Sequence, residues 1–426
     1  MYPDFQYLLQ SLLGTDMPEW LSIFKTFGFL VALAFMAAAI TLTSELKRKE
    51  SEGLLTPSFE TIEIGHPASA NDLLWASLLG FFIGFKLGGI FGNAAQISPN
   101  PMGYIFSLQG NWLTGIAGAL ILAYSKYSEK RKHQLPQPEQ KRVAVYPHQR
   151  VGEFVVIAAV GGILGAKIFN AFETWDSFVK DPIGSLLSPS GLTFYGGLIV
   201  ATVALYFYSK KYSIPFKHLA DAAAPGLMLA YGVGRLGCHF AGDGDWGIFN
   251  SAYITGIDGK LHLATIADFK QRLNEAAPYF TSNFGSLATT PHSFAPAPSW
   301  LPDWIYAMNY PHNVNNEGVM LNNCVGNYCY VLPVGVFPTA LYEAAMGVGI
   351  FAILWAVRKK LKYGWQMFGL YLIFNGLERF FIEKARVNYK YDWGFIHPTQ
   401  AEIISALLVI IGIVILVYKR KQRVAI

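Results

Sequence analysis

Nine apolar segments of about 20 residues each constrain the fold of this chain more than any other feature of its sequence. They cover residues 20–43, 72–92, 105–125, 151–171, 191–209, 218–237, 337–357, 365–386 and 399–418. As a helix, each segment is long enough to cross a hydrocarbon core of about 30 Å. Only 14% of the 426 residues are charged, whereas a soluble protein carries about a quarter. The sequence therefore predicts an all-α polytopic membrane protein with about nine transmembrane helices.

The basic residues predict the orientation of these helices. Of the 33 Lys and Arg residues, 21 lie in the loops and the tail that follow the odd-numbered segments, and five lie in the opposite loops. Because basic loops stay in the cytoplasm, we expect the N-terminus outside and the C-terminus inside. The net charge of +5 is then explained by topology. No basic stripe indicates a nucleic-acid partner, and the N-terminal MYPDFQYLLQ lacks the basic region of a cleavable signal peptide.

Loop lengths divide the chain into three predicted regions. Residues 1–237 hold helices 1–6 and a cytoplasmic linker at 126–150, residues 238–336 form an outer-face segment, and residues 337–426 hold helices 7–9 and a basic cytoplasmic tail. The outer segment contains Cys324 and Cys329. An oxidising compartment would permit a disulfide between them, although the spacing alone leaves this open. A zinc site needs more ligands than this stretch supplies, so no metal site is predicted.

Two segments share a G-x3-G-x-K pattern. LLGFFIGFKLGG surrounds Lys86 and AVGGILGAKIFN surrounds Lys167. One interpretation is helix packing through small residues, followed by a lysine that reaches the outer membrane interface. The alternative is an internal duplication of a helix pair.

Ionisable residues within the apolar segments indicate a functional site near the outer membrane face. A charge at mid-bilayer costs roughly 2.5–3.5 kcal/mol, so such residues usually face a cavity or a partner. They are Lys167, Arg235, Glu343, Glu378, Arg379, Glu383, Lys384 and Arg386. Ion pairs at the interface, such as Glu383 with Arg379, are the competing interpretation. Arg235 is different because glycines flank it and no acid lies four residues away. Guanidinium groups and glycine-rich backbone suit phosphate recognition, so we expect a phospholipid-phosphate site.

Four motifs resemble those of the prolipoprotein diacylglyceryl transferase family. GRLGCHFAGDGDWG at 234–247 resembles the family pattern G-R-x-G-N-F-x-N-G-E-x-W-G. Three further stretches resemble its S-F-H-G-G-L, P-S-Q-L-Y-E-A and R-F-x-V-E-x-x-R segments: GLTFYGGLIV at 191–200, FPTALYEA at 337–344 and ERFFIEKAR at 378–386. These motifs occur in the family's order and span much of the chain.

The resemblance implies an enzyme of the bacterial inner membrane. Family members transfer the diacylglyceryl group of phosphatidylglycerol to the lipobox cysteine of a prolipoprotein and release glycerol phosphate, without a cofactor. By motif position, Arg235 and Arg379 correspond to the family's headgroup- and phosphate-binding arginines. The resemblance also gives a set of substrate-binding candidates: Gly234, Gly237, Gly242, Asp245, Tyr342, Glu343, Glu383, Arg386, Lys167, Gly196 and Gly197.

Three departures from the family pattern concern the catalytic base. The family's histidine corresponds to Tyr195, its asparagine to Cys238, and its acidic position to Asp243 and Asp245. A phenol with a pKa near 10 is a weak base at neutral pH. We therefore keep Tyr195 as a catalytic candidate and add His239 and Asp243 as candidate bases. The family usually has seven helices, so one additional pair is expected here.

Two other functions remain open from the sequence. A secondary transporter would also carry intramembrane charges and a repeat, although its site would lie near the bilayer midplane. A catalytically silent scaffold that presents residues 238–336 is conceivable because of the substitutions at Tyr195 and Cys238.

Overall fold

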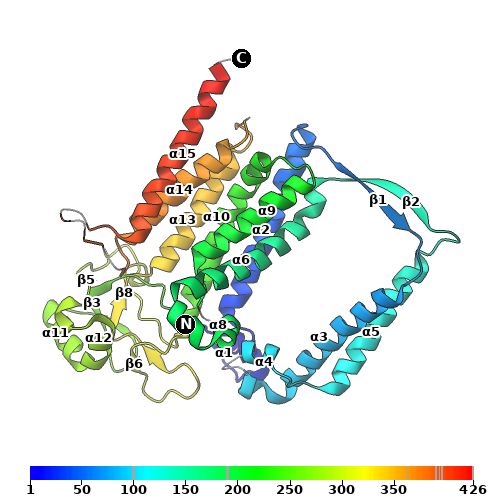
Figure 1. The fold of residues 1–426 in the computed structure, drawn as a ribbon. Helices are drawn as coiled ribbons and strands as arrows, with labels where there is room; N and C mark the ends of the chain where they lie inside the picture. The colour runs from blue at the N-terminus through cyan, green and yellow to red at the C-terminus, as the bar shows by residue number, and fades with distance from the viewer. Residues whose placement is uncertain are drawn as a thin grey trace. The chain divides into compact units, whose positions relative to one another are not determined.

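The computed structural model describes residues 1–97, 101–188, 191–361, 363–388, 391–392, 394 and 397–424, and long helices dominate it (Figure 1). Nine of the helices overlap the nine predicted segments: α2 (Thr26–Ser51), α3 (Ala70–Ile97), α5 (Trp112–Lys132), α6 (Val151–Glu173), α9 (Phe194–Lys211), α10 (Phe216–Ala241), α13 (Thr339–Val357), α14 (Gln366–Glu383) and α15 (Gln400–Val424). The shorter helices are α1 (Phe5–Leu13), α4 (Pro101–Phe106), α7 (Trp175–Lys180), α8 (Pro182–Leu187), α11 (Ile266–Glu275) and α12 (Ala277–Phe284).

Five helical stretches of the described chain are long and apolar enough to cross a membrane. They are Thr26–Ser51, Ala70–Phe91, Pro147–Glu173, Thr339–Val357 and Gln400–Tyr418, with mean hydropathies between 1.7 and 2.7. The prediction of a mostly helical, polytopic membrane protein is confirmed. The remaining long helices are less apolar because they carry polar or charged residues, such as Lys210 and Lys211 in the last turn of α9.

The prediction of an all-α protein was wrong, because the chain also contains strands. Four strands of the outer segment form one sheet: β3 (Phe249–Thr255), β4 (Leu261–Leu263), β5 (His292–Ser293) and β8 (Val334–Val336). Two further strands of this segment, β6 (Val319–Met320) and β7 (Tyr330–Val331), pair with each other. The last pair is β1 (Ser58–Ile64) with β2 (Glu139–Val145). The sequence signal was weak because five of the eight described strands have only two or three residues.

The chain divides into two compact units. The first comprises Met1–Asp16, Phe24–Leu42 and Lys217–Ile426, and the second comprises Met17–Ile23 and Thr43–Phe216. Each is described separately below.

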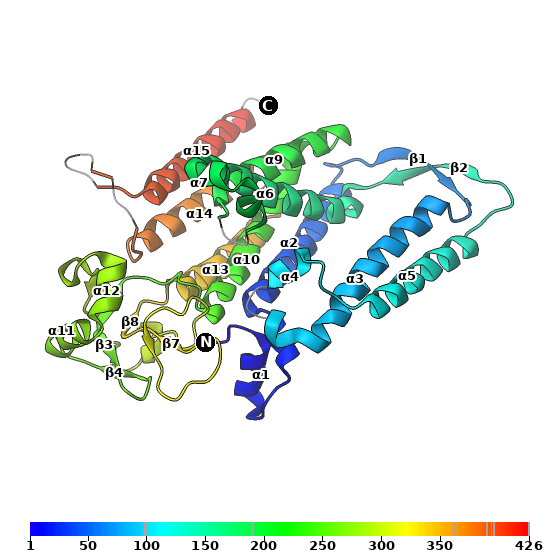
Figure 2. The same cartoon turned by 60° about the horizontal axis from the view of Figure 1, so that its bottom comes forward.

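Small residues set the helix spacing in the first unit. α14 and α15 lie side by side (Figures 1 and 2), and a Cβ at Gly376 would stand 2.7 Å from the Ser405 carbonyl oxygen. A Cβ at Gly347 of α13 would stand 3.0 Å from the Gly232 Cα of α10. Such contacts let helix backbones approach closely. The contact of Gly347 with Gly232 brings α13 close to α10 in the region of Glu343 and Arg235.

The outer segment of the first unit has its own hydrophobic core. β3 lies at the centre of its sheet, pairing antiparallel with β4 and β8 and parallel with β5. Aromatic residues of the sheet, of α11 and α12, and of a later loop fill the core: Phe249, Phe269, Phe280 and Tyr310. A disulfide joins Cys324 to Cys329, whose Cα atoms lie 5.5 Å apart. The predicted outer segment 238–336 thus begins within α10, which ends at Ala241, and the remainder folds around this core. We call residues 242–336 the outer domain.

In the second unit, two helical hairpins share one construction. Lys86 donates hydrogen bonds to the carbonyl oxygens 18 and 21 residues later, Tyr104 at 2.7 Å and Ser107 at 2.6 Å. Lys167 contacts the carbonyl oxygens at the same separations, Ser185 at 3.3 Å and Ser188 at 2.5 Å. This shared geometry favours the duplication hypothesis for α3–α5 and α6–α9. The small-residue packing of the other interpretation is also present, since a Cβ at Gly84 would stand 2.2 Å from the Thr114 carbonyl oxygen. The Lys86 side chain is buried within the protein, with 7% exposure.

The α3–α5 hairpin is attached through a two-stranded ribbon (Figure 2). β1 and β2 pair antiparallel from Ser58 with Val145 to Ile64 with Glu139. The chain therefore enters and leaves this hairpin at one point. The predicted linker at 126–150 is in fact ordered over much of its length, because α5 continues to Lys132 and β2 follows.

We expect Lys86→Met to lower the apparent melting temperature of the detergent-solubilised protein by several degrees. The Lys86 ammonium also donates to the Gln109 carbonyl oxygen at 2.9 Å, so the substitution leaves three acceptors without this donor. Lys126→Met is the matched control, because Lys126 forms an exposed pair with Glu129 at 3.0 Å. Equal melting temperatures for the two variants would show that the buried ammonium does not stabilise the hairpin.

Candidate active site

Charged residues from the ends of three helices meet in the first unit. Arg235 lies in the penultimate turn of α10, Glu343 in the second turn of α13, and Arg379 and Glu383 in the last two turns of α14. Arg386 lies three residues after the end of α14. The structure thus brings together residues that lie as many as 151 positions apart in the sequence. We call Arg235, Arg379 and Arg386 the arginine cluster.

Glu343 is the centre of this arrangement. Its side chain has 0% exposure, and its carboxylate oxygens lie 3.2 Å from Arg235 Nε, 3.2 Å from Arg379 Nη1 and 3.4 Å from Arg386 Nη1. One buried carboxylate therefore orients all three guanidinium groups. Arg379 and Arg386 donate hydrogen bonds to Oε1, and Arg235 forms an ion pair with Oε2. A buried charge with three such cationic partners is favourable only while the partners stay in place.

Asp245 forms a second bridge across the arginine cluster. Its two carboxylate oxygens contact Arg235 Nη1 and Arg386 Nη2, while Arg379 Nη2 lies 3.0 Å from Glu383. The arginine side chains keep 15–27% exposure. They are thus fixed from the protein side and still accessible. Oriented, partly desolvated guanidinium groups are suited to binding a phosphate.

Glycines shape the turn that carries Asp245. α10 ends at Ala241, and Gly242 follows with a φ of 65°, a conformation that commonly ends helices at glycine. Gly244 has a φ of 93°, which any residue with a Cβ rarely adopts. The chain can therefore turn back sharply enough to bring Asp245 to the arginines. This is the physical role of the glycines in the GDGDWG stretch.

The two candidate bases in the first unit have different surroundings. Asp243 lies near Cys238 and Arg235: burial raises the pKa of its carboxyl, while a hydrogen bond from the Cys238 thiol and the charge of Arg235 oppose that shift. His239 is buried, and its Nδ1 lies 3.2 Å from the hydroxyl of Tyr310 in the outer domain. Asp243 is therefore close to the arginine cluster, whereas the described contacts of His239 join α10 to the outer domain.

The remaining first-unit candidates have mainly structural contacts. The Tyr342 hydroxyl donates to the carbonyl oxygen of Ile305, in the outer domain. Gly237 faces α2, where an added Cβ would stand 3.2 Å from the Phe27 ring. A Cβ at Gly234 would meet no described heavy atom within 4 Å, so that position is open.

Tyr195, Gly196, Gly197 and Lys167 belong to the second unit. Tyr195 lies in the first turn of α9 with 37% exposure. Both glycines pack against α6, and a Cβ at Gly196 would stand 2.6 Å from the Gly165 carbonyl oxygen. Lys167 contacts backbone carbonyls, as described above. The two glycines and the lysine thus hold the hairpin that presents Tyr195.

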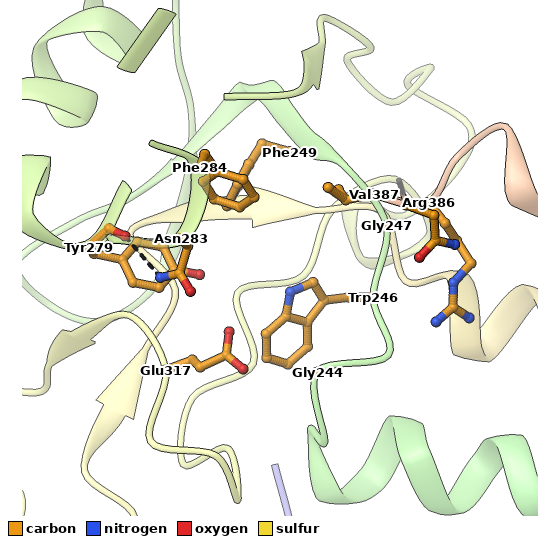
Figure 3. A pocket seen from close by; sticks show the side chains of 11 residues that line it. Gly244, Trp246, Gly247, Phe249, Tyr279, Asn283, Phe284, Glu317, Arg386 and Val387 are labelled. Carbon is orange, nitrogen blue, oxygen red and sulfur yellow. Dashed lines mark hydrogen bonds between the residues drawn. The ribbon is translucent and has the colours of Figure 1, made fainter. Parts of the chain in front are cut away.

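The sequence analysis did not assign Tyr231 or Trp246. The Tyr231 ring centre lies 5.2 Å from the Arg235 guanidinium carbon, and its hydroxyl lies 3.1 Å from Glu378. Its position one helical turn before Arg235 was the available signal. Trp246 lines a cavity of about 360 Å³ together with residues of the outer domain (Figure 3). Among the described residues, no cluster of three or more His, Cys, Asp or Glu could hold a metal ion.

Comparison with known proteins identifies the family of this chain. The sequence profile of the family described as prolipoprotein diacylglyceryl transferase matches residues 107–418. A phosphatidylglycerol–prolipoprotein diacylglyceryl transferase of Dehalococcoides mccartyi is 25% identical over 286 residues, which cover 67% of this chain and 83% of the relative. One of Chlorobaculum tepidum is 24% identical over 340 residues, or 76% of this chain and 91% of the relative. The profile spans the arginine cluster and most of the chain, and we conclude that this protein belongs to the prolipoprotein diacylglyceryl transferase family.

Proposed function

We propose that this protein transfers the diacylglyceryl group of phosphatidylglycerol to the lipobox cysteine of prolipoproteins. The observation that carries the proposal is the arginine cluster, whose three guanidinium groups are oriented by the buried Glu343. This cluster matches a substrate with one phosphate, and the relatives in the family carry this activity in their names.

The proposed reaction is a substitution at carbon. The cysteine thiolate attacks the glycerol carbon that bears the phosphate ester, so that a carbon–sulfur bond forms as the carbon–oxygen bond breaks. Both bonding electrons leave with glycerol phosphate, and the thiol proton passes to a base or to solvent. The leaving phosphate gains negative charge during this step. Cationic donors fixed around it therefore stabilise the transition state more than the bound lipid.

The carboxylates prepare the arginines for this role. Arg235, Arg379 and Arg386 are each held by at least one carboxylate in the described structure. We propose that the phosphate takes over some of the guanidinium contacts that Asp245 makes, while Glu343 remains in place beneath them. Because the donors are oriented before the lipid arrives, little reorganisation is needed during the reaction.

We expect Tyr195→Phe to reduce turnover by about 10- to 100-fold, as one lost hydrogen-bonding role would. In this hypothesis Tyr195 orients the lipid, and the cationic surroundings lower the thiol pKa so that no strong base is required. Rates should rise with pH along the titration of the substrate thiol in both proteins. Tyr195→His, which introduces the family's usual residue, is the matched control and should retain activity. Complete loss in Tyr195→Phe, with lipid binding intact, would instead identify Tyr195 as the base.

We also propose nine membrane crossings in a bacterial cell membrane, with the outer domain outside the cytoplasm. The expected result of cysteine-accessibility labelling is that residues in 126–150 react only from the cytoplasmic side and residues in 238–336 only from the outer side. The reason is the concentration of basic residues in alternate loops. Labelling of both segments from one side would contradict the nine-crossing topology.

A transfer assay distinguishes this function from transport or a silent scaffold. Purified protein with phosphatidylglycerol and a lipobox peptide should yield a diacylglyceryl-modified peptide, and the same peptide with serine in place of cysteine should remain unmodified. Solute uptake into vesicles without any modified peptide would favour a transporter. If the folded protein shows neither activity, the scaffold function is favoured.

A further inference from the structure

The cavity beside Trp246 extends from the arginine cluster into the outer domain (Figure 3). Its walls come from four places in the chain: the stretch Gly244–Phe249, helix α12, Glu317, and the stretch Arg386–Asn388 after α14. At about 360 Å³ it falls within the size range of ligand pockets, roughly 300–1,000 Å³.

One end of this cavity adjoins the proposed reaction centre. Arg386 lines the cavity and also contacts Asp245 and Glu343. Trp246 and Gly247, which line the cavity as well, follow Asp245 directly in the chain. A molecule in the cavity would therefore lie next to a phosphate bound by the arginines. The acceptor cysteine must also reach the phosphate site, and the polypeptide that carries this cysteine has to extend away from that site.

Aromatic rings and amides line the cavity together. Phe249, Phe284, Tyr279 and Trp246 supply apolar surface (Figure 3). Asn283 donates its amide to the Tyr279 carbonyl oxygen at 2.9 Å, and its side-chain oxygen remains as an acceptor among the described contacts. A polypeptide segment can pack its apolar side chains against aromatic rings and donate its backbone N–H groups to such acceptors. Acyl chains could not donate to the Asn283 side-chain oxygen or to the carboxylate of Glu317, and burying these acceptors without a donor costs free energy.

Glu317 gives the cavity a charge preference. Its carboxylate accepts a hydrogen bond from Asn315 Nδ2 at 3.0 Å, and within the described chain it forms no ion pair. At the other end, Arg386 is already paired with Asp245 and Glu343. Burial and the neighbouring Glu317 charge raise the pKa of Tyr279, so the phenol stays neutral and the carboxylate is the uncompensated charge there. Such a carboxylate attracts a cation or several N–H donors.

We infer that this cavity binds the acceptor polypeptide beside its lipobox cysteine, with an apolar side chain against the aromatic rings and a basic residue near Glu317. The inference rests on the proposed transferase function and adds to it the place and the charge preference of the protein substrate. The glycerol headgroup of the lipid is the competing occupant, but it has no apolar surface to match four aromatic rings.

A charge exchange tests the inference. Two sets of lipobox peptides would carry either Lys or Glu at the second, third or fourth residue after the cysteine. For wild-type protein, we expect at one of these positions a KM about 5- to 20-fold lower for the Lys peptide than for the Glu peptide. Glu317→Lys should reverse this preference, with kcat and the dependence on phosphatidylglycerol unchanged. Glu275→Lys is the matched control, because Glu275 ends α11, pairs with Arg272 and does not line the cavity.

A second measurement does not depend on turnover. A peptide with serine in place of the cysteine and a photoreactive group near the preferred position should cross-link to α12, and Phe284→Ser should weaken this labelling. Cross-linking without any transfer would contradict the proposed function and support the cavity assignment. Transfer without either the charge exchange or the cross-link would overturn the cavity assignment. A Glu317→Lys effect confined to the phosphatidylglycerol dependence would also overturn it, in favour of the lipid headgroup.

Discussion

Glu343→Gln is expected to reduce diacylglyceryl transfer by about 1,000-fold, the upper end of what one oriented electrostatic group contributes. The substitution keeps the shape of the side chain and removes the charge that holds Arg235, Arg379 and Arg386. Because Glu343 has 0% exposure, water cannot replace the lost contacts. Removing one partner of a buried ion pair typically costs about 3–5 kcal/mol, so we also expect a lower melting temperature.

The measurement is the initial rate of transfer to a lipobox peptide, together with thermal unfolding in detergent. Glu402→Gln is the matched control, since Glu402 is also a buried carboxylate and its described ion pair is with the exposed Lys384. We expect that control to lose less than about 10-fold in rate, as for a partly exposed pair. A Glu343→Gln rate within the range of the control would show that the arginines do not need this carboxylate.

The second large effect concerns the arginines themselves. Arg235→Lys should lower transfer by about 100-fold or more, because lysine offers a single point charge. Arg235 uses Nε to contact Glu343 at 3.2 Å and Nη1 to contact Asp245, and a lysine cannot maintain both contacts while binding a phosphate. Arg379→Lys should have a similar effect, since Arg379 joins Glu343 to Glu383.

The measurement is kcat/KM with respect to phosphatidylglycerol. Arg272→Lys, on α11 of the outer domain, is the control for a general loss of stability, because Arg272 pairs with the exposed Glu275. Near-normal turnover in a protein with lysine at both 235 and 379 would mean that the arginines only satisfy interfacial charges.

The sequence predicted correctly those features for which the alternative arrangement would be energetically unfavourable. Arg235 and Glu343 stood out because charges in apolar segments need partners, and the structure brings them within 3.2 Å. The helices were predictable for the same reason, since an apolar segment of about 20 residues has few alternatives. Their ends were less certain: α5 begins only at Trp112, where Asn111 caps it, rather than at residue 105 as expected.

Features that depend on distant contacts could not be predicted. Lys86 resembled an interfacial lysine because its partners lie 18–23 residues later, in a loop whose path the sequence does not specify. The fold of the outer domain depends on short strands, and β3 pairs with β8 about 80 residues further along the chain. The cavity was hidden for the same reason, because Trp246, Tyr279 and Arg386 meet only through the tertiary fold.

The most direct test of the central claim follows both products of one reaction. Purified protein would receive phosphatidylglycerol labelled separately in its diacylglyceryl group and its headgroup glycerol, together with a lipobox peptide. The proposed function predicts that one thioether-linked diacylglyceryl peptide forms for each glycerol phosphate released, and that Arg235→Lys reduces both products equally. Absence of modified peptide in folded wild-type protein, or release of glycerol phosphate without the thioether, would contradict it.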